Sequence, residues 1–168
     1  MPSPSKNKGN SFERQVADFL TNLYSEKFLR APGSGAYIGG KNTVRKEFLH
    51  EGQIRTFKGD IIPGESFPRI NIECKSYKDF PFHQLYTGSC KQLDEWIKQC
   101  LEVADNGDFT IIFMKFNRKG IYIATPTQSQ LTYKNHTTYQ SLNYGTWIIQ
   151  EHNTFWHDNS GIVKQLSQ

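Results

Sequence analysis

The sequence "FKGDIIPGESFPRINIECKSYKDF", residues 57–80, holds two stretches that are typical of β-strands. "GDIIP" and "RINIECKSY" are rich in isoleucine and are bounded by glycine and proline, which favours two strands separated by a turn. The connection between them, residues 63–69, is short enough for a hairpin. The two strands are therefore expected to lie side by side.

Three charged side chains accompany these strands. Side chains two positions apart in a strand point the same way, so Glu73 and Lys75 share one face while Ile72 and Cys74 share the other. The apolar pair is expected to face the core. A neighbouring strand through "GDII" would bring Asp60 to the same end of the sheet, where the three charged groups would converge.

Such a convergence has a chemical and a structural interpretation. Two close carboxylates repel each other unless a cation lies between them, and oxygen ligands suit Mg²⁺ or Mn²⁺. A metal ion held by Asp60 and Glu73 could bind a phosphodiester oxygen and activate water, while Lys75 stabilises negative charge. In the structural alternative, Asp60 ends a turn, and Glu73 and Lys75 line the wet face of an amphipathic strand.

Two helices are expected outside this segment. Apolar residues recur at helical spacing over residues 9–29, and Asn10 or Ser11 can cap the first turn. A second helix is expected within residues 88–107, where the chain stops at an Asn-Gly pair. Glutamines such as Gln99 on this helix could polarise water or contact DNA, although they are more typical of a polar surface.

The remaining chain up to residue 126 predicts strands and loops. Residues 108–126 predict two strands joined by a turn at Asn117 to Gly120, residues 30–42 predict a loop, and residues 47–57 predict one or two short strands. The element order is α, several β, α, β, β. This order is that of an α/β protein.

The length of 168 residues fits one compact domain over residues 1–168. Residues 1–8 are polar and are expected to be disordered. Residues 126–168 are polar and aromatic with weak periodicity, and they are expected to form a C-terminal extension packed on the core over the sheet edge. In a second interpretation, some of these aromatic rings stack on unpaired bases.

Composition excludes several classes of protein. A mean hydropathy of −0.63, with no apolar run near the roughly 18 residues of a membrane span, argues against membrane insertion. The N-terminus lacks the apolar core of a secretory signal, so a cytoplasmic location is expected. The three cysteines show no zinc-binding spacing and are expected to be reduced.

The positive charge lies in the first part of the chain. Residues 1–60 hold 10 Lys and Arg against 6 Asp and Glu, and residues 61–168 hold 10 against 10, so the net charge of +4 belongs to the first part. An ordinary solvated surface would explain this modest excess equally well. Otherwise these side chains could line a surface for a polyanion: Lys6, Lys8, Arg14, Arg30, Lys41, Arg45, Lys46, Arg55 and Lys58.

Several motifs together resemble those of the PD-(D/E)XK nuclease superfamily, and most of all those of the archaeal-type Holliday junction resolvases and their phage relatives. "KGNSFERQVADFL" resembles the start of these proteins, with Lys8, Gly9 and Glu13. "RAPGSG" resembles their arginine and serine-glycine loop. In these proteins an acid at a strand start and an I-E-x-K strand follow, and Asp60 and "IECK" resemble them here.

The resemblance covers roughly residues 8–125 by element order and departs from the family at two points. Gly59 stands where the first acid is usually preceded by proline. A spacer of 25 residues separates Ser34 from Asp60, and it carries the basic residues Lys41, Arg45 and Lys46.

The resemblance implies a restriction-endonuclease-like core, with a central mixed β-sheet flanked by helices in the order α-β-β-β-α-β. It also implies that Asp60 and Glu73 bind Mg²⁺, that Mn²⁺ can substitute, and that Lys75 is catalytic. Glu13 would orient a ligand or water, and Ser34 would lie near the scissile phosphate. DNA would contact basic side chains: Lys8, Arg14, Arg30, Lys41, Arg45 and Lys46.

The function expected from these implications is that of a Mg²⁺-dependent endonuclease that cleaves four-way junctions or other branched DNA as a homodimer, in the host cytoplasm if a phage encodes it. A restriction-like or repair endonuclease on linear duplex DNA is the alternative, because the catalytic core is shared and loops set substrate choice. A different alternative is a non-catalytic DNA-binding module whose acids are structural.

Overall fold

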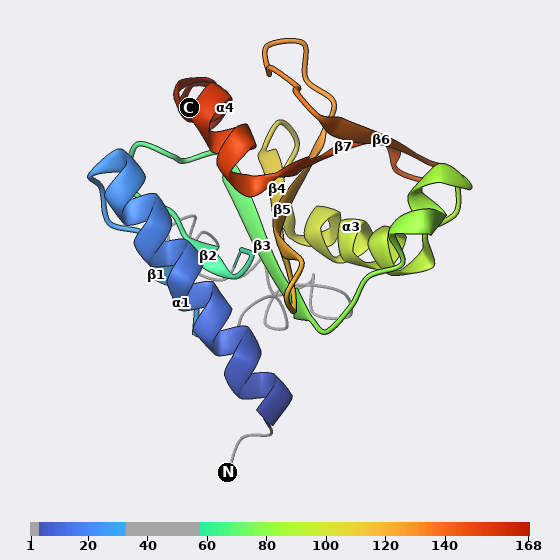
Figure 1. Ribbon diagram of the computed structural model, residues 1–168. Helices are drawn as coiled ribbons and strands as arrows, with labels where there is room; N and C mark the ends of the chain where they lie inside the picture. The colour runs from blue at the N-terminus through green and yellow to red at the C-terminus, as the bar shows by residue number, and fades with distance from the viewer. Residues whose placement is uncertain (1–3, 33–57) are drawn as a thin grey trace.

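A computed structural model describes residues 4–32 and 58–168, with side chains from Lys8 onward. A five-stranded sheet lies between helices on both of its faces (Figure 1). Along the chain the elements are α1 (Pro4–Tyr24), β1 (Leu29–Arg30), β2 (Ile61–Ile62), β3 (Ile70–Tyr77), the 3-10 helix η2 (Phe82–Tyr86), α3 (Lys91–Val103), β4 (Phe109–Phe116), β5 (Gly120–Pro126), β6 (His136–Ser141), β7 (Gly145–Glu151) and α4 (His152–Leu166).

The sheet is mixed, with the strand order β3-β4-β5-β7-β6. Strands β3 and β4 pair in parallel, with Glu73 opposite Ile112, and α3 forms the crossover between them. The other pairs are antiparallel. The predicted α/β class and the central mixed sheet flanked by helices are therefore confirmed.

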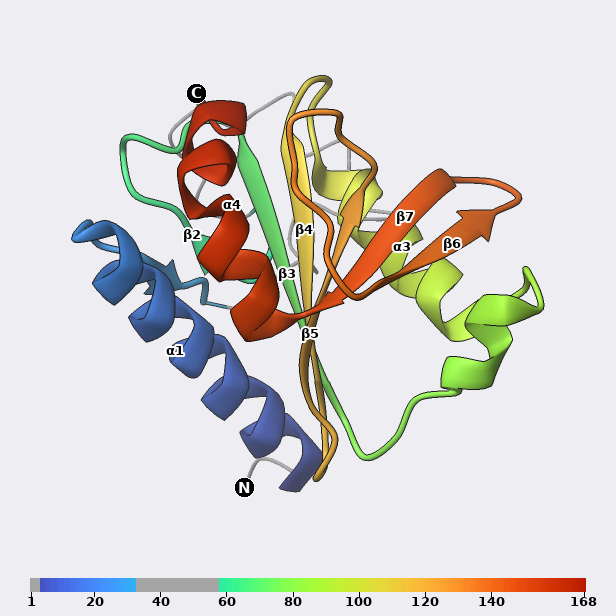
Figure 2. The ribbon, with the colours of Figure 1, turned by 45° about the horizontal axis from the view of Figure 1, so that its top comes forward.

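Each face of the sheet has its own hydrophobic core. Ile72, Ile111 and Phe113 pack on one face beneath α1 and α4, whereas Ile112 and Met114 pack on the other beneath α3. Figure 2 shows α1 and α4 on one side of the sheet and α3 on the other. Because both faces are covered, β4 is a nearly continuous hydrophobic run rather than an alternating strand.

The predicted first helix is confirmed, but its start differs from the prediction. It begins at Pro4, so Asn10 and Ser11 lie inside α1 and do not cap it, and part of the segment expected to be disordered is helical. Proline is tolerated in the first turn of a helix because its missing N–H would have no partner there. The helix ends before Ser25, whose φ of 52° is left-handed.

The hairpin expected within residues 57–80 does not form. Strand β2 pairs antiparallel with β1 instead, with Arg30 opposite Ile61. The reason is tertiary, since the two-residue β1 meets β2 from a distant part of the chain. By contrast, the turn expected at Asn117 to Gly120 is confirmed, because β4 and β5 pair with Phe116 opposite Gly120. The strands predicted in residues 47–57 lie outside the described residues.

The C-terminal segment extends the sheet and does not merely cover its edge. Strand β7 pairs with β5, with Ile149 opposite Ala124, and β6 follows as the outer strand. Its weak periodicity has a physical cause, since its apolar side chains are divided between the two cores. Four of its aromatic residues are buried and unavailable to unpaired bases: Tyr139, Trp147, Phe155 and Trp156.

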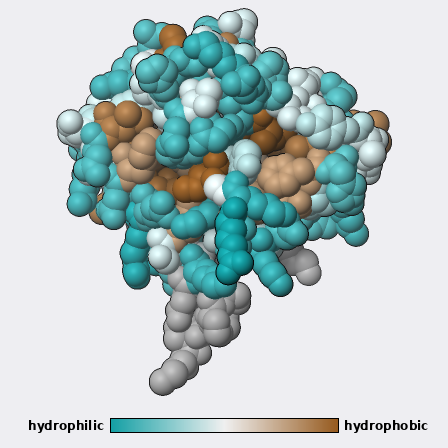
Figure 3. All heavy atoms as spheres, in the orientation of Figure 1, coloured by the Kyte–Doolittle hydropathy of each residue, from teal (hydrophilic) through white to brown (hydrophobic). Residues whose placement is uncertain are grey.

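The face of the molecule seen in Figure 3 is mostly polar. Figure 3 shows mainly hydrophilic side chains, with apolar atoms in the hollows between them. No helix within residues 4–32 and 58–168 combines the length and the hydrophobicity needed to cross a membrane.

Candidate active site

Asp60 lies directly before β2 and is held against β3 by two hydrogen bonds. Its backbone N–H donates to the Ile72 carbonyl oxygen at 2.8 Å. The backbone N–H of Cys74 donates to Asp60 Oδ2 at 2.7 Å. Because β3 is an edge strand of the sheet, its free side is open to the segment that carries Asp60. The acid therefore reaches β3 without the predicted hairpin.

Glu73 and Lys75 share one face of β3, as strand alternation predicts. The Lys75 ammonium donates to Glu73 Oε1 at 2.6 Å and to Gln99 Oε1 at 2.7 Å. The side chains of Lys75 and Glu73 are only 12% and 9% exposed, so solvent screens their ion pair weakly. Gln99 comes from α3, which covers this face of the sheet.

Glu13 approaches from α1 and is paired with Arg30 of β1. Arg30 Nε donates to Glu13 Oε2 at 2.5 Å, and Arg30 Nη2 donates to Asn10 Oδ1 at 2.7 Å. The resemblance predicted Arg30 as a DNA contact, yet in this structure its guanidinium is bonded to two α1 side chains. Its side chain is 26% exposed, so part of it still meets solvent.

The three acids influence one another electrostatically. Burial, and then the nearby charge of Asp60, raise the pKa of Glu73 to about 7. The same two causes raise the pKa of Glu13. Burial tends to lower the pKa of Lys75, but the Glu73 carboxylate outweighs it and the net shift is upward. The site thus holds more negative charge than its single lysine neutralises.

The donor set fits a hard divalent cation. Asp60 and Glu73 each use one carboxylate oxygen for the hydrogen bonds above. Within the described part of the chain, the second oxygen of each carboxylate is left for a ligand. A cation there would relieve the repulsion between them, and carboxylate oxygens suit Mg²⁺. Across residues 8–32 and 58–168, no three His, Cys, Asp or Glu side chains form a ready metal site.

Only some of the residues predicted to contact DNA lie within the described part of the chain. Lys8 and Arg14 are exposed on α1. Ser34, Lys41, Arg45 and Lys46 lie outside the described residues. Further exposed basic side chains, which the sequence analysis did not single out, lie just after β3 and in the β4–β5 turn: Lys78, Arg118 and Lys119.

Two residues take roles that sequence reasoning missed. Lys58, counted among the residues for a polyanion surface, is 5% exposed and is paired with Asp105 and Asp108. Gln99, regarded as a surface residue, bonds the lysine of the site. No local signal marks either role, because each partner lies at least 24 positions away in the sequence.

A small pocket elsewhere is separate from this site. It holds about 50 Å³ and adjoins Phe113, which belongs to the face of the sheet opposite Glu73 and Lys75. It is lined by Phe12, Gln15, Val16, Phe19, Phe113, Ile121 and His152.

Comparison with known proteins identifies a family. A family model described as "Phage putative PDDEXK endonuclease" matches residues 4–166. Neither a search of curated proteins nor a search of solved structures finds a match. The superfamily predicted from "KGNSFERQVADFL", Asp60 and "IECK" is confirmed, while the closer likeness to Holliday junction resolvases stays a prediction. Since the match spans nearly the whole sequence, this chain belongs to the phage PDDEXK endonuclease family.

Proposed function

We propose that this protein is a Mg²⁺-dependent endodeoxyribonuclease in which Asp60 and Glu73 hold the metal ion and Lys75 is the catalytic cation. One observation carries the proposal. At the free edge of β3, Asp60 and Glu73 are buried, Lys75 is half-buried beside Glu73, and the pKa of Glu73 is raised to about 7. Displaced pKa values of this kind cluster at functional sites.

The metal ion, when bound, would neutralise charge at the phosphate and lower the pKa of the attacking water. The chain supplies the remaining functions. The raised pKa of Lys75 keeps it protonated at neutral pH, so its ammonium can donate to the attacking water or to a phosphoryl oxygen. The Cys74 N–H orients the Asp60 carboxylate, and Gln99 holds Lys75 in place.

Glu13 has a supporting role in this proposal. Its carboxylate is buried, feels the charge of Asp60 and is fixed by Arg30. A carboxylate in this position can orient a water molecule beside the metal ligands, which is the role that the family resemblance implies.

Three substitutions test the catalytic assignment. Asp60→Asn, Glu73→Gln and Lys75→Ala should each abolish Mg²⁺-dependent cleavage and leave DNA binding largely intact. Matched controls on exposed helix positions are Asp18→Asn, Glu95→Gln and Lys91→Ala, which should cleave as the wild type does. A wild type that stays inert with both Mg²⁺ and Mn²⁺ on every DNA tested would favour a non-catalytic DNA-binding module.

For the substrate, we propose branched DNA, cut by a homodimer whose two-fold axis presents one active site to each of two strands. The support is the likeness of the Lys8, Glu13 and Arg30 motifs to those of junction resolvases. A mobile four-way junction should receive symmetric paired nicks that a linear duplex of the same sequence lacks. Equal cutting of both DNAs would instead favour a restriction-like or repair enzyme, and light scattering should give the mass of a dimer.

A further inference from the structure

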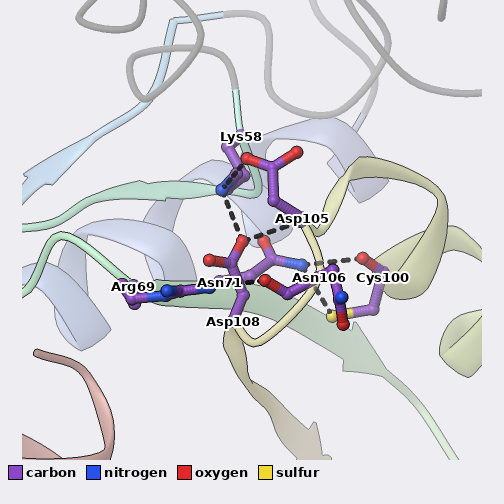
Figure 4. Close-up of polar contacts among 7 residues, drawn as sticks. All are labelled: Lys58, Arg69, Asn71, Cys100, Asp105, Asn106 and Asp108. Atoms are coloured by element: carbon purple, nitrogen blue, oxygen red, sulfur yellow. Dashed lines mark hydrogen bonds and ion pairs between the residues drawn. The ribbon is translucent and has the colours of Figure 1, made fainter.

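A buried ion pair lies two residues before Asp60. The Lys58 side chain is 6% exposed, and its ammonium donates to Asp105 Oδ2 at 2.7 Å and also bonds Asp108. The Asp108 side chain is 3% exposed, whereas that of Asp105 is 56% exposed. Figure 4 shows Lys58 pointing at the two aspartates. Burial removes Lys58 from any surface that could meet a phosphate.

The acidic partners belong to a closed turn at the start of β4. The N–H of Asp105 donates to Asp108 Oδ2 at 2.8 Å, and the N–H of Asp108 donates to the Asp105 carbonyl oxygen at 3.0 Å. Phe109, the first residue of β4, donates its N–H to the Arg69 carbonyl oxygen at 2.8 Å. The turn is thus part of the β3–β4 pairing and gives Lys58 a fixed attachment point.

The residue between Lys58 and Asp60 is pressed against β3. Gly59 has a φ of +68°, and a Cβ atom there would overlap the Ile72 carbonyl oxygen and lie 2.7 Å from Asn71 Oδ1. Asn71 is itself held, because its Nδ2 donates to the Cys100 carbonyl oxygen at 2.7 Å. The chain entering Asp60 is therefore fixed at Lys58 on one side and on β3 on the other.

A buried ion pair is a weak source of stability, since desolvation of the two charges offsets much of their attraction. Its geometry, in contrast, fixes where two distant segments meet. We propose that Lys58 and Asp108 are positioning residues, whose ion pair sets the Asp60 carboxylate against Glu73 for metal binding. The inference rests on the proposed function, because it assigns Asp60 and Glu73 to the metal ion.

The sharpest test is the double variant Lys58→Met/Asp108→Asn. It removes both charges together, so that neither is left buried alone, and the amide oxygen of the new side chain at position 108 can still accept the Asp105 N–H. We expect faster hydrogen exchange at the Asp60 amide in the metal-free protein, with exchange in β5 unchanged. We also expect about 10-fold weaker Mn²⁺ binding by calorimetry, the lower end of the effect of groups that orient metal ligands.

Two further variants complete the design. Lys134→Met/Asp158→Asn removes another ion pair, one that joins the segment before β6 to α4, and should leave the Asp60 amide and Mn²⁺ affinity unchanged. Asp108→Asn alone keeps Lys58 paired with Asp105. It should change Asp60 amide exchange and Mn²⁺ affinity in the same direction as the double variant does, but by a smaller amount. If the double variant does not fold, this single variant decides the question.

The outcomes separate this inference from the proposed function. A folded double variant that matches the wild type in both hydrogen exchange at Asp60 and Mn²⁺ affinity overturns the positioning role. If the wild-type protein still cleaves DNA, the nuclease proposal is unaffected by that result. A wild type that neither binds Mn²⁺ nor cuts DNA contradicts the proposed function. Even then, exchange at the Asp60 amide shows whether the ion pair fixes this segment.

Discussion

At the scale of single residues, each acid of the candidate site is buried beside a hydrogen-bond donor. Glu73 is bonded by Lys75, Glu13 by Arg30, and Asp60 by the backbone N–H of Cys74. Strand alternation, a local property, was enough to predict that Glu73 and Lys75 share a face. The depth of burial and the donors from other elements depend on contacts between distant segments, so the sequence alone did not reveal them.

The raised pKa of Glu73 predicts how the stability of the metal-free protein depends on pH. The folded protein holds the Glu73 proton more tightly than the unfolded chain does. The resulting stabilisation of the folded protein is therefore present below about pH 4.5 and is lost as pH rises to about 7. A shift from 4.5 to about 7 bounds the loss at about 3 kcal/mol. Urea unfolding in EDTA should show the wild type losing stability relative to Glu73→Gln over this range. A wild type that instead gains stability relative to this variant as pH rises would contradict the assignment.

Gly59 predicts a second effect at this scale. Gly59→Ala should destabilise the protein by more than the roughly 1–2 kcal/mol of a left-handed alanine, because its Cβ would also meet the Ile72 carbonyl oxygen. Gly88→Ala is the matched control, since Gly88 has a similar φ of +74° and no atom within 4 Å of the added Cβ. Thermal unfolding of both variants measures the difference, and equal losses would show that the close approach to β3 has no cost.

At the scale of elements, short strands and helix ends organise the site. Strand β1 has two residues, yet it places Arg30 beside Glu13 and pairs with β2, which follows Asp60. The helical periodicity of residues 9–29 predicted α1, but the predicted start was wrong, because the helix begins at Pro4 and Asn10 and Ser11 lie inside it. Two-residue strands carry too little pattern to predict.

The start of α4 predicts a capping effect. Glu151 caps this helix by accepting the backbone N–H groups of Asn153 and Thr154, each at 2.9 Å. Glu151→Ala should therefore cost about 1 kcal/mol of stability in thermal unfolding at neutral pH. Glu151→Gln keeps an oxygen acceptor and should cost less. Unchanged stability of Glu151→Ala would show that the cap contributes nothing.

At the scale of the whole molecule, the C-terminal segment is part of the central sheet. Strand β7 lies between β5 and β6, and α4 contributes Phe155, Trp156 and Val163 to the same core as α1. The sequence predicted an extension over the sheet edge because the apolar residues of this segment follow no single period. Strands β6 and β7 contribute Tyr139, Trp147 and Ile149 to one core, whereas α4 faces the other, so strand and helix periods follow each other within one short segment.

Truncation tests how far the fold depends on this segment. A chain that ends at Pro126 should lose cooperative thermal unfolding, because it exposes the edge of β5 and uncovers Phe113 and Ile123. Amide chemical-shift dispersion measured by NMR should collapse with it. A chain that lacks only the exposed Gln168 is the control and should match the full-length protein. Retained dispersion after truncation would show that residues 127–168 are dispensable for folding.

Local sequence patterns were enough to predict the α/β class, the helical nature of α1 and α3, the β4–β5 hairpin and the shared face of Glu73 and Lys75. These features follow from periodicity and turn residues within short windows, where neighbouring positions carry the whole signal. Three features became apparent only in the folded chain: β2 pairs with β1, Lys58 is buried against Asp108, and β7 enters the sheet. Each of those depends on segments far apart in sequence, whose meeting is set by packing rather than by local pattern.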